Sequence, residues 1–285
     1  MGILVRAGVK KVRLTGGEPT IRRDLNVIVA GLGALRPQLS DVGITTNGLL
    51  IDRSLAMFDA HGCTQLNLSL DTLVPAKFVL LSRRPSKWYD RVWRNVMAIV
   101  ENPRFELKLN CVVMRNYNED EIADFVDLAR KLPVEVRFLE FMPFDGNSWC
   151  EDRLVSLAEI FGRMRAAEEH LRPVPTSNSN TAKLFDAPGW RGRVGLISPM
   201  TDAFCGGCNR LRLTADGQLK NCLFGEEEWS LREMLKEGAS DNEILSKIEE
   251  AVRAKHFAHG GHAGPADLQD RAAAGANRSM IRIGG

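Results

Sequence analysis

Three cysteines form the most specific chemical pattern in this sequence. Cys205, Cys208 and Cys222 follow the spacing C-x2-C-x13-C. The first residues carry no charged segment followed by a sustained apolar run, so a secretory signal is not expected. Clustered thiols then indicate a metal or iron–sulfur site rather than a disulfide framework. The remaining cysteines, which stand apart and are predicted to be small buried hydrophobic residues, are Cys63, Cys111 and Cys150.

Three thiolates leave either a zinc ion or a four-iron cluster one ligand short. In the zinc interpretation a histidine completes a structural site, and in the cluster interpretation the fourth iron stays open for a substrate. The spacing alone favours zinc. Arg210 and Arg212 favour the cluster, because a structural zinc site does not need two neighbouring guanidinium groups. The candidate fourth zinc ligands are His256, His259 and His262.

A β-hairpin is predicted to hold these groups together. Residues 215–217 can form a three-residue loop with Gly217 in the left-handed conformation, which pairs Thr214 with Gln218. A two-residue loop would reverse the parity and separate the groups. In the three-residue register, the side chains that share one face are those of Cys208, Arg210, Arg212 and Cys222.

The elements that position this hairpin begin with a repeated strand–helix pattern. Five β-branched runs alternate with segments of helical periodicity, which predicts βαβ units and one curved parallel sheet or barrel. The runs cover residues 11–15, 42–46, 65–71, 107–114 and 134–142. Later segments are predicted as a surface helix (152–170), a loop (174–181), an extended run (193–200) and a helix from about residue 240. The chain ends in a tail rich in glycine and alanine.

Two residue pairs have the spacing of a helix capping box. They are Asn118 with Glu121 and Ser240 with Glu243, and each pair is predicted to cap the helix that follows it.

Polar side chains share one face of several predicted strands, because side chains alternate along a strand. Two interpretations stand: a polar cavity for an anionic ligand, or the solvated face of an antiparallel sheet, and the strand–helix pattern favours the cavity. In the fifth run Arg137 shares its face with Leu139 and Phe141, which interrupts the polar pattern. The polar-face residues are Lys11, Arg13, Thr15, Asn67, Ser69, Asp71, Lys108 and Asn110.

Glycine-containing loops follow the first two strands. The segment TGGEPT (15–20) ends the first run and TTNG (45–48) ends the second. Gly-Gly-Glu-Pro is by itself compatible with an ordinary loop. Its place at the carboxyl end of a strand favours ligand binding, since parallel sheets bind ligands there and paired glycines allow close approach.

The composition excludes several classes of protein. The chain has 285 residues, 44% hydrophobic and 26% charged, with a formal net charge of +2. These values exclude disordered and collagen-like chains. No apolar window is long enough to span a bilayer, and the balanced charge predicts neither a nucleic-acid nor a membrane surface.

Taken together, these motifs resemble the GTP 3′,8-cyclase family, the radical S-adenosylmethionine enzymes of molybdenum cofactor biosynthesis. The resemblance runs in order along the whole chain, and LDTLVPAKF (70–78) and NCVVM (110–114) are most similar to eukaryotic members. The segments that carry it are KVRLTGGEPTIR (11–22), TTNG (45–48), NLSLD (67–71), RFLEFMP (137–143), FCGGCNRLRL (204–213) and the terminal Gly284-Gly285.

The resemblance implies a role for individual residues. The GTP contacts would be Arg13, Thr45, Lys108, Arg210, Leu211 and Arg212, with Lys11 and Arg137 as further candidates. The S-adenosylmethionine contacts would be Gly17, Ser69 and Met142. The ligands of a C-terminal [4Fe-4S] cluster, whose open iron takes the guanine base, would be Cys205, Cys208 and Cys222. The residues implied in catalysis are Arg210, Arg212, Gly284 and Gly285, the glycines reaching into the active site.

The implied reaction is the first step of molybdenum cofactor biosynthesis. A 5′-deoxyadenosyl radical abstracts the ribose 3′-hydrogen of GTP, and the ribose carbon attacks C8 of guanine to give (8S)-3′,8-cyclo-7,8-dihydroguanosine 5′-triphosphate. Cyclic pyranopterin monophosphate synthase would act next. The resemblance also implies a homodimer without nucleic-acid or membrane partners, located in the mitochondrial matrix if the source is eukaryotic and in the cytoplasm otherwise.

One family motif does not occur in the 285 residues. Family members hold a second [4Fe-4S] cluster, which cleaves S-adenosylmethionine, on C-x3-C-x2-C. We therefore expect an N-terminally incomplete chain: an α/β fold with an open TIM-type (β/α)6 barrel that lacks its first βα unit (1–143), followed by a cluster-binding domain with a β-hairpin (144–285). Two alternatives are a non-catalytic GTP- or zinc-binding module and another radical enzyme with an auxiliary cluster.

Overall fold

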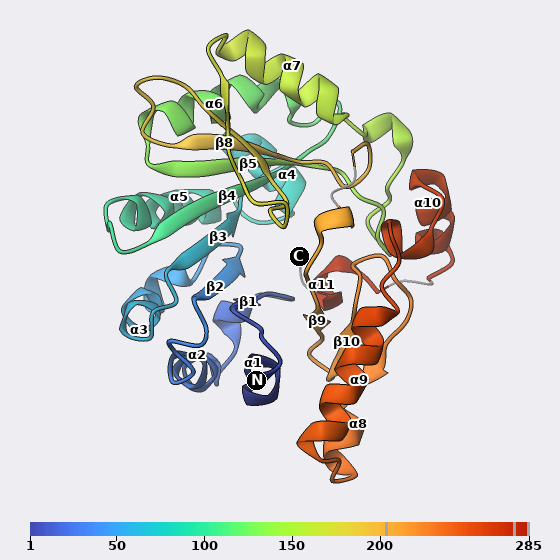
Figure 1. Ribbon diagram of the computed structural model, residues 1–285. Helices are drawn as coiled ribbons and strands as arrows, with labels where there is room; N and C mark the ends of the chain where they lie inside the picture. Colours follow the sequence, from blue (N-terminus) through green and yellow to red (C-terminus); the bar gives the residue numbers. More distant parts are fainter. Residues whose placement is uncertain (203–204, 276–277, 284–285) are drawn as a thin grey trace.

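Eight strands form one curved, mostly parallel sheet within the residues that the structure describes, which are 1–202, 205–275 and 278–283 (Figure 1). The structure is a computed structural model. The strand order is β1-β2-β3-β4-β5-β8-β7-β6, in which β1 to β5 and β8 are parallel and β7 is antiparallel to β8 and β6. These strands are β1 (Lys11–Leu14), β2 (Asp41–Thr46), β3 (Gln65–Ser69), β4 (Glu106–Val113), β5 (Val134–Glu140), β6 (Arg172–Val174), β7 (Lys183–Asp186) and β8 (Arg193–Ile197).

Three short strands form a second sheet, in the order β11-β10-β9. They are β9 (Arg212–Leu213), β10 (Gln218–Lys220) and β11 (Trp229–Ser230). The helices are α1 (Gly2–Arg6), α2 (Leu25–Gly33), α3 (Leu55–Ala60), α4 (Pro75–Ser82), α5 (Lys87–Val100), α6 (Ile122–Lys131), α7 (Leu157–Ala167), α8 (Leu231–Lys236), α9 (Asp241–Arg253), α10 (Pro265–Ala273) and α11 (Met280–Ile283). Of these described helices, none combines the length and apolar character needed to cross a membrane.

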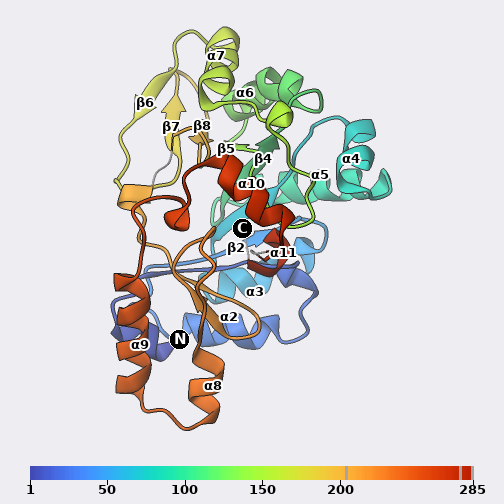
Figure 2. The same cartoon turned by 90° about the vertical axis from the view of Figure 1, so that its right-hand side faces the viewer.

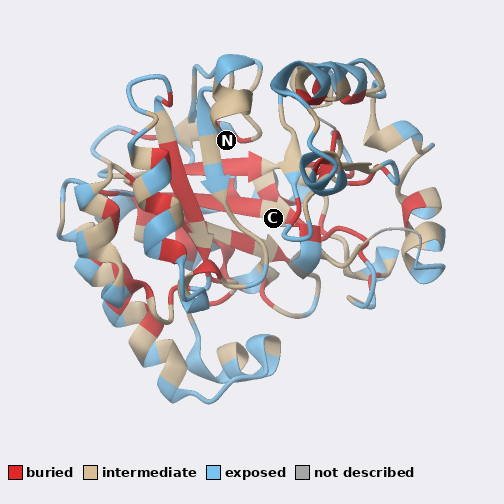
Figure 3. Cartoon of the chain, turned by 90° about the horizontal axis from the view of Figure 1, so that it is seen from below, coloured by how far each residue is buried: buried red, intermediate tan, exposed pale blue. Residues whose placement is uncertain are grey.

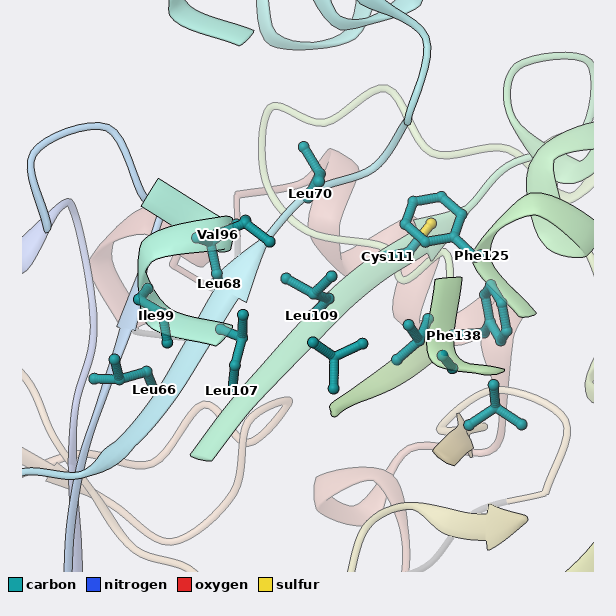
Figure 4. Close-up of a cluster of buried hydrophobic side chains, with 14 of the residues drawn as sticks. Leu66, Leu68, Leu70, Val96, Ile99, Leu107, Leu109, Cys111, Phe125 and Phe138 are labelled. Carbon is teal, nitrogen blue, oxygen red and sulfur yellow. The ribbon is translucent and has the colours of Figure 1, made fainter. Parts of the chain in front are cut away.

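The predicted strand–helix pattern is confirmed. The five β-branched runs form β1 to β5, and the later extended run forms β8. One face of this sheet packs on the surrounding helices, which lie along its outer side in Figure 1. Figure 3 shows that buried residues concentrate in the strands. The central part of this core, drawn in Figure 4, includes Leu66, Leu68, Val96, Ile99, Leu107, Leu109, Phe125 and Phe138.

The opposite face of the sheet carries polar side chains in register across neighbouring strands. Thr45 aligns with Asn67, Asn67 with Lys108, and Lys108 with Glu135. Asn110 aligns with Arg137 in the next row. The expectation that β5 interrupts the polar pattern is therefore wrong, because Glu135 and Arg137 extend the polar face before Leu139 ends it.

The C-terminal elements lie across this polar face, as Figures 1 and 2 show. α1 packs on these C-terminal elements: Ile3 and Leu4 contact a buried cluster that includes Leu219 and Ile248, and Arg6 forms an ion pair with Asp241. A second apolar cluster joins the two regions of the chain. Its buried members are Met142, Phe144, Met200, Phe224, Leu268 and Ile283.

One predicted capping box is confirmed and the other is wrong. Ser240 accepts a hydrogen bond from Glu243 N, and the Glu243 carboxylate accepts one from Ser240 N at 2.7 Å. Asn118 instead donates to the carbonyls of Asp71 (2.7 Å) and Val112 (2.8 Å). Its expected partner, Glu121, accepts from Thr72 and its neighbour on the adjacent β3–α4 connection. Tertiary partners therefore compete successfully with the local cap.

Candidate functional site

Cations from distant parts of the sequence converge over the polar face of the sheet. Arg13 is exposed to solvent on one side, while neighbouring protein atoms bury the rest of its side chain. This burial lowers the pKa of Arg13 to about 10, and the charges of Arg137 and Arg210 lower it further. Burial and then Arg137 likewise lower the pKa of Lys108. Crowding of like charges is unfavourable unless an anion binds among them.

One carboxylate lies within this cationic site. Glu135 is 5% exposed and accepts hydrogen bonds from Arg137 Nε and, at 2.6 Å, from Arg193 Nε. Burial would raise its pKa, but the charges of Arg137, Arg193 and Lys108 outweigh that effect and the pKa is lowered. Glu135 therefore stays ionised and fixes the direction of the Arg137 guanidinium.

Three buried polar atoms on the same face lack a hydrogen-bond partner among the described residues. They are Thr45 Oγ1, Asn67 Oδ1 and Asn110 Oδ1, on the neighbouring strands β2, β3 and β4. A buried oxygen without a partner costs on the order of 1–3 kcal/mol, so three on adjacent strands indicate a place where a ligand or ordered water binds.

The Gly-Gly-Glu-Pro loop is tied to the loop after β2. Glu18 accepts from Thr20 N (3.0 Å), Thr46 Oγ1 (2.7 Å) and Asn47 N (2.7 Å), so it joins both glycine-containing loops. Gly17 has φ +49°, and no heavy atom lies within 4 Å of the place where its Cβ would be. A ligand can therefore approach the backbone of this loop.

The hairpin that carries the cysteine motif has the predicted register. Gly217 has φ +84°, and Thr214 N donates to the Gln218 carbonyl at 2.9 Å. Arg212 pairs with Lys220 across the two strands, which places Lys220 on the face predicted for the thiols. Leu211, an implied GTP contact, is partly buried just before β9.

Arg212 lies within reach of two of the cysteines. Burial lowers its pKa to about 10 and the charge of Arg210 adds to this, while Cys222 and Cys208 act in the opposite direction. Burial would raise the pKa of the Cys208 thiol, but a hydrogen bond from the Arg210 backbone and the charge of Lys255 lower it. Thiolate formation, which cluster binding requires, is thus favoured at Cys208.

The zinc alternative needs a histidine beside the three thiols. Among the described residues, which include all six candidate ligands, no three His, Cys, Asp or Glu side chains are close enough to hold one metal ion. His259 Nε2 lies 2.7 Å from the Pro199 carbonyl and His262 Nε2 lies 3.2 Å from the Phe224 carbonyl. In a four-iron cluster each of Cys205, Cys208 and Cys222 would bind a different iron.

The other implied site residues fall at different places. Ser69 is exposed at the end of β3, and Lys11 is exposed and pairs with Asp41 at 2.8 Å. Met142 is buried in the apolar cluster beside the C-terminal elements. Gly284 and Gly285, together with Phe204 of the cysteine motif, lie outside the described residues.

Sequence reasoning missed several residues of the site. Glu135 follows from strand parity, because it is two residues before Arg137 on the same strand. Glu140, Arg193 and Lys255 gave no local signal. Glu140 is fully buried and accepts from Leu157 N and Met200 N, both at 2.8 Å, so it anchors the segment that leads to the cysteine motif.

Comparisons with known proteins give two family matches along the chain. Residues 1–129 match the Radical SAM superfamily, and residues 134–261 match the family described as Molybdenum Cofactor Synthesis C. The chain is 46% identical over 284 residues to "GTP 3′,8-cyclase, mitochondrial" of Arabidopsis thaliana, covering 100% of this chain and 70% of that protein. It is 47% identical over 269 residues to "Molybdenum cofactor biosynthesis protein 1" of Bos taurus, covering 94% of this chain but only 42% of the relative.

A solved structure supports the fold. The structure of Streptococcus suis SuiB bound to S-adenosylmethionine aligns with a TM-score of 0.60 at 15% identity, covering 87% of this chain and 58% of that one. The likeness shows a shared α/β radical SAM fold with a mostly parallel sheet.

Proposed function

The chain belongs to the GTP 3′,8-cyclase family, the radical S-adenosylmethionine proteins of the first step of molybdenum cofactor biosynthesis, and from that premise we propose that the polar face of its sheet binds GTP for cyclisation. The observation that carries this proposal is the convergence of Arg13, Arg137 and Arg210, which come from β1, β5 and the cysteine hairpin. A triphosphate would neutralise this crowded positive charge.

Different residues of the chain would bind different parts of GTP. Arg13, Lys108 and Arg137 would bind phosphate oxygens, with Glu135 holding the Arg137 fork in place. The unpartnered oxygens of Thr45, Asn67 and Asn110 would accept from ribose or base donors. The implied contact at Lys11 is the weakest, because that side chain is exposed and already paired with Asp41.

The cysteine hairpin would hold the substrate's other end. When bound to Cys205, Cys208 and Cys222, a [4Fe-4S] cluster would supply an iron with an open coordination position for the guanine base. The donor set fits such a group, since all three thiols are free and two of them lie beside Arg212. Arg210 and Arg212 would orient the nucleotide between the cluster and the sheet. The role of Gly284 and Gly285 stays a prediction from the resemblance, because both lie outside the described residues.

The S-adenosylmethionine site would lie at the carboxyl ends of the strands. Gly17 and Ser69 are accessible there, and Glu18 keeps the Gly-Gly loop against the loop after β2. Met142 would contribute through the apolar cluster at the end of β5.

The C-x3-C-x2-C motif that would hold the cleaving cluster does not occur in the 285 residues, and the three remaining cysteines do not replace it. Radical formation would require a cleaving cluster, which Cys205, Cys208 and Cys222 are not proposed to hold.

We further propose that β1 to β5 and β8 are part of an open (β/α)6 barrel, with residues 1–143 as the barrel core and 144–285 as the cluster-binding domain. The proposed partners are GTP, a second copy of the chain, and cyclic pyranopterin monophosphate synthase as the next enzyme. The chain spans less than half of the bovine relative. The name of the plant relative supports a mitochondrial location.

Equilibrium dialysis under anaerobic conditions tests the GTP site. The chain should bind GTP at least about tenfold more tightly than GMP, and Arg13→Ala should remove most of this preference, because a charged hydrogen bond contributes about 1.5–3 kcal/mol. Lys87→Ala, at the start of α5, is the control and should leave binding unchanged. Equal affinity for GTP and GMP would contradict the proposal. Stoichiometric zinc without iron would favour the alternative, a non-catalytic GTP- and zinc-binding module.

A further inference from the structure

The segment that follows α9, residues 255–262, contacts the first loop of the cysteine motif through a lysine. Lys255 Nζ donates to the Arg210 carbonyl at 2.7 Å and lies 3.5 Å from Cys208 Sγ. One ammonium group therefore contacts both the sulfur of a proposed cluster ligand and the backbone of a proposed GTP-binding arginine.

The same segment also contacts the loop after the third cysteine. His262 Nε2 donates to the Phe224 carbonyl at 3.2 Å. Gly260 has φ +67°, and a Cβ there would lie 2.7 Å from Gly225 N, so the two backbones pack directly. Residues 255–262 thus bracket both cysteine-bearing loops, with Lys255 at one end and His262 at the other. This fixes where the lysine stands relative to the hairpin.

The position of Lys255 also has an electrostatic consequence. A four-iron cluster on three thiolates is an anion, and reduction makes it more negative. Cations and hydrogen-bond donors near the sulfurs therefore stabilise the reduced form and raise the reduction potential. The Lys255 ammonium is both a cation and a hydrogen-bond donor, and it is directed at the sulfur of Cys208.

We propose that Lys255 is a positioning residue of the cysteine site, which fixes the Cys208 sulfur relative to the backbone of Arg210. The Arg210 side chain is thereby held at a fixed position relative to the cluster. The phosphates and the base of one nucleotide can then be bound at the same time. The proposal rests on the proposed function, since it concerns the same cluster and the same GTP site.

The test compares Lys255→Met, Lys255→Arg and Lys247→Met in anaerobically prepared full chain. Lys247 is the matched control, because it lies on α9 in an ion pair with Glu250, away from the cysteines. The measurements are iron content, the midpoint potential of the C-terminal cluster from a redox titration followed by electron paramagnetic resonance, and the dissociation constant for GTP. Circular dichroism verifies folding.

Lys255→Met should retain iron, lower the midpoint potential and weaken GTP binding about tenfold or more, which is the loss expected for a charged hydrogen bond. Lys255→Arg keeps the charge but changes the donor geometry, so the potential should stay near the wild-type value while GTP binding weakens. If Lys255→Met does not fold, the arginine variant carries the test. Lys247→Met should match the wild type.

Two negative results lead to different conclusions. A wild-type chain that binds iron and GTP, with Lys255 variants that match Lys247→Met in potential and affinity, overturns the role of Lys255 and leaves the proposed function intact. A wild-type chain that binds neither iron nor GTP overturns both.

Discussion

The substitution Glu140→Gln tests whether a buried carboxylate organises the approach to the cysteine motif. Glu140 is at the end of β5 and has no exposed surface. One carboxylate oxygen accepts from Leu157 N at 2.8 Å and from the Thr201 hydroxyl, and the other accepts from Met200 N at 2.8 Å and Thr201 N at 3.0 Å. A single side chain thus joins β5, the start of α7 and the segment before Cys205.

The size of the effect follows from these contacts. Glutamine replaces one carboxylate oxygen with an NH2 group. The NH2 group fits best at the oxygen that faces the Thr201 hydroxyl, because the hydroxyl can rotate and accept a hydrogen bond from it. That arrangement leaves Leu157 N without its carboxylate acceptor, at a cost of about 1–3 kcal/mol. The bonds to Met200 N and Thr201 N lose the charge of the acceptor, which removes about 1 kcal/mol more. Glu140→Gln should therefore lower the free energy of unfolding by about 2–4 kcal/mol.

Urea denaturation followed by circular dichroism measures this loss. The slope with urea concentration should match the wild type, because the surface exposed on unfolding is the same. Glu169→Gln, at an exposed site beyond the end of α7, is the control and should change stability by less than about 0.5 kcal/mol. A loss below about 1 kcal/mol in Glu140→Gln would refute the reasoning, since it would mean that the four bonds do not hold these segments together.

Three further predictions concern backbone packing, pH and the C-terminal tail. Gly260→Ala should be at least about 1 kcal/mol more destabilising than Gly238→Ala in urea denaturation, because both positions have positive φ but only Gly260 would bring its Cβ to 2.7 Å from Gly225 N; equal losses would contradict this. Burial raises the pKa of Asp71 from 3.8 to about 6, so the unfolded state ionises first and this carboxyl lowers stability by up to about 3 kcal/mol as the pH rises from about 4 to about 6. The stability of the wild type relative to Asp71→Asn should therefore fall over this range; parallel pH profiles of the two proteins would argue against it. Arg278→Gln removes hydrogen bonds to the carboxylates of Glu228 and Asp216. Carboxypeptidase should then release the C-terminal residues about fivefold faster or more, as measured by mass spectrometry. An unchanged rate of release would show that these hydrogen bonds do not protect the C-terminus.

Much of the fold was predictable because it depends on local rules. The alternation of apolar and polar residues identified β1 to β5 and the face that each side chain takes. Turn chemistry identified the hairpin, since Gly217 alone permits the left-handed conformation that fixes the register of Arg212 against Lys220. Ser240 and Glu243 formed the predicted capping box, and the hydrogen bonds of their side chains in the described structure join these two residues.

The features that were predicted wrongly or not at all share one cause, which is that they depend on tertiary contacts. Asn118 and Glu121 have the same spacing as the confirmed capping box, but strand β4 and the β3–α4 connection offer them better partners. No local pattern predicts that competition, because it depends on which distant segments pack beside the helix.

The sequence by itself determined the family motifs, the parallel sheet and the polar face that runs along it, since these depend on periodicity and on residues close together in the chain. Only the tertiary structure decided which groups become the partners of the charged side chains at the site. Glu135 and Arg193 meet across 58 residues, and Lys255 reaches Cys208 across 47. Such contacts exist only when packing of the apolar core fixes the distances, so the partners of the charged groups, unlike their identities, could not be predicted from the sequence.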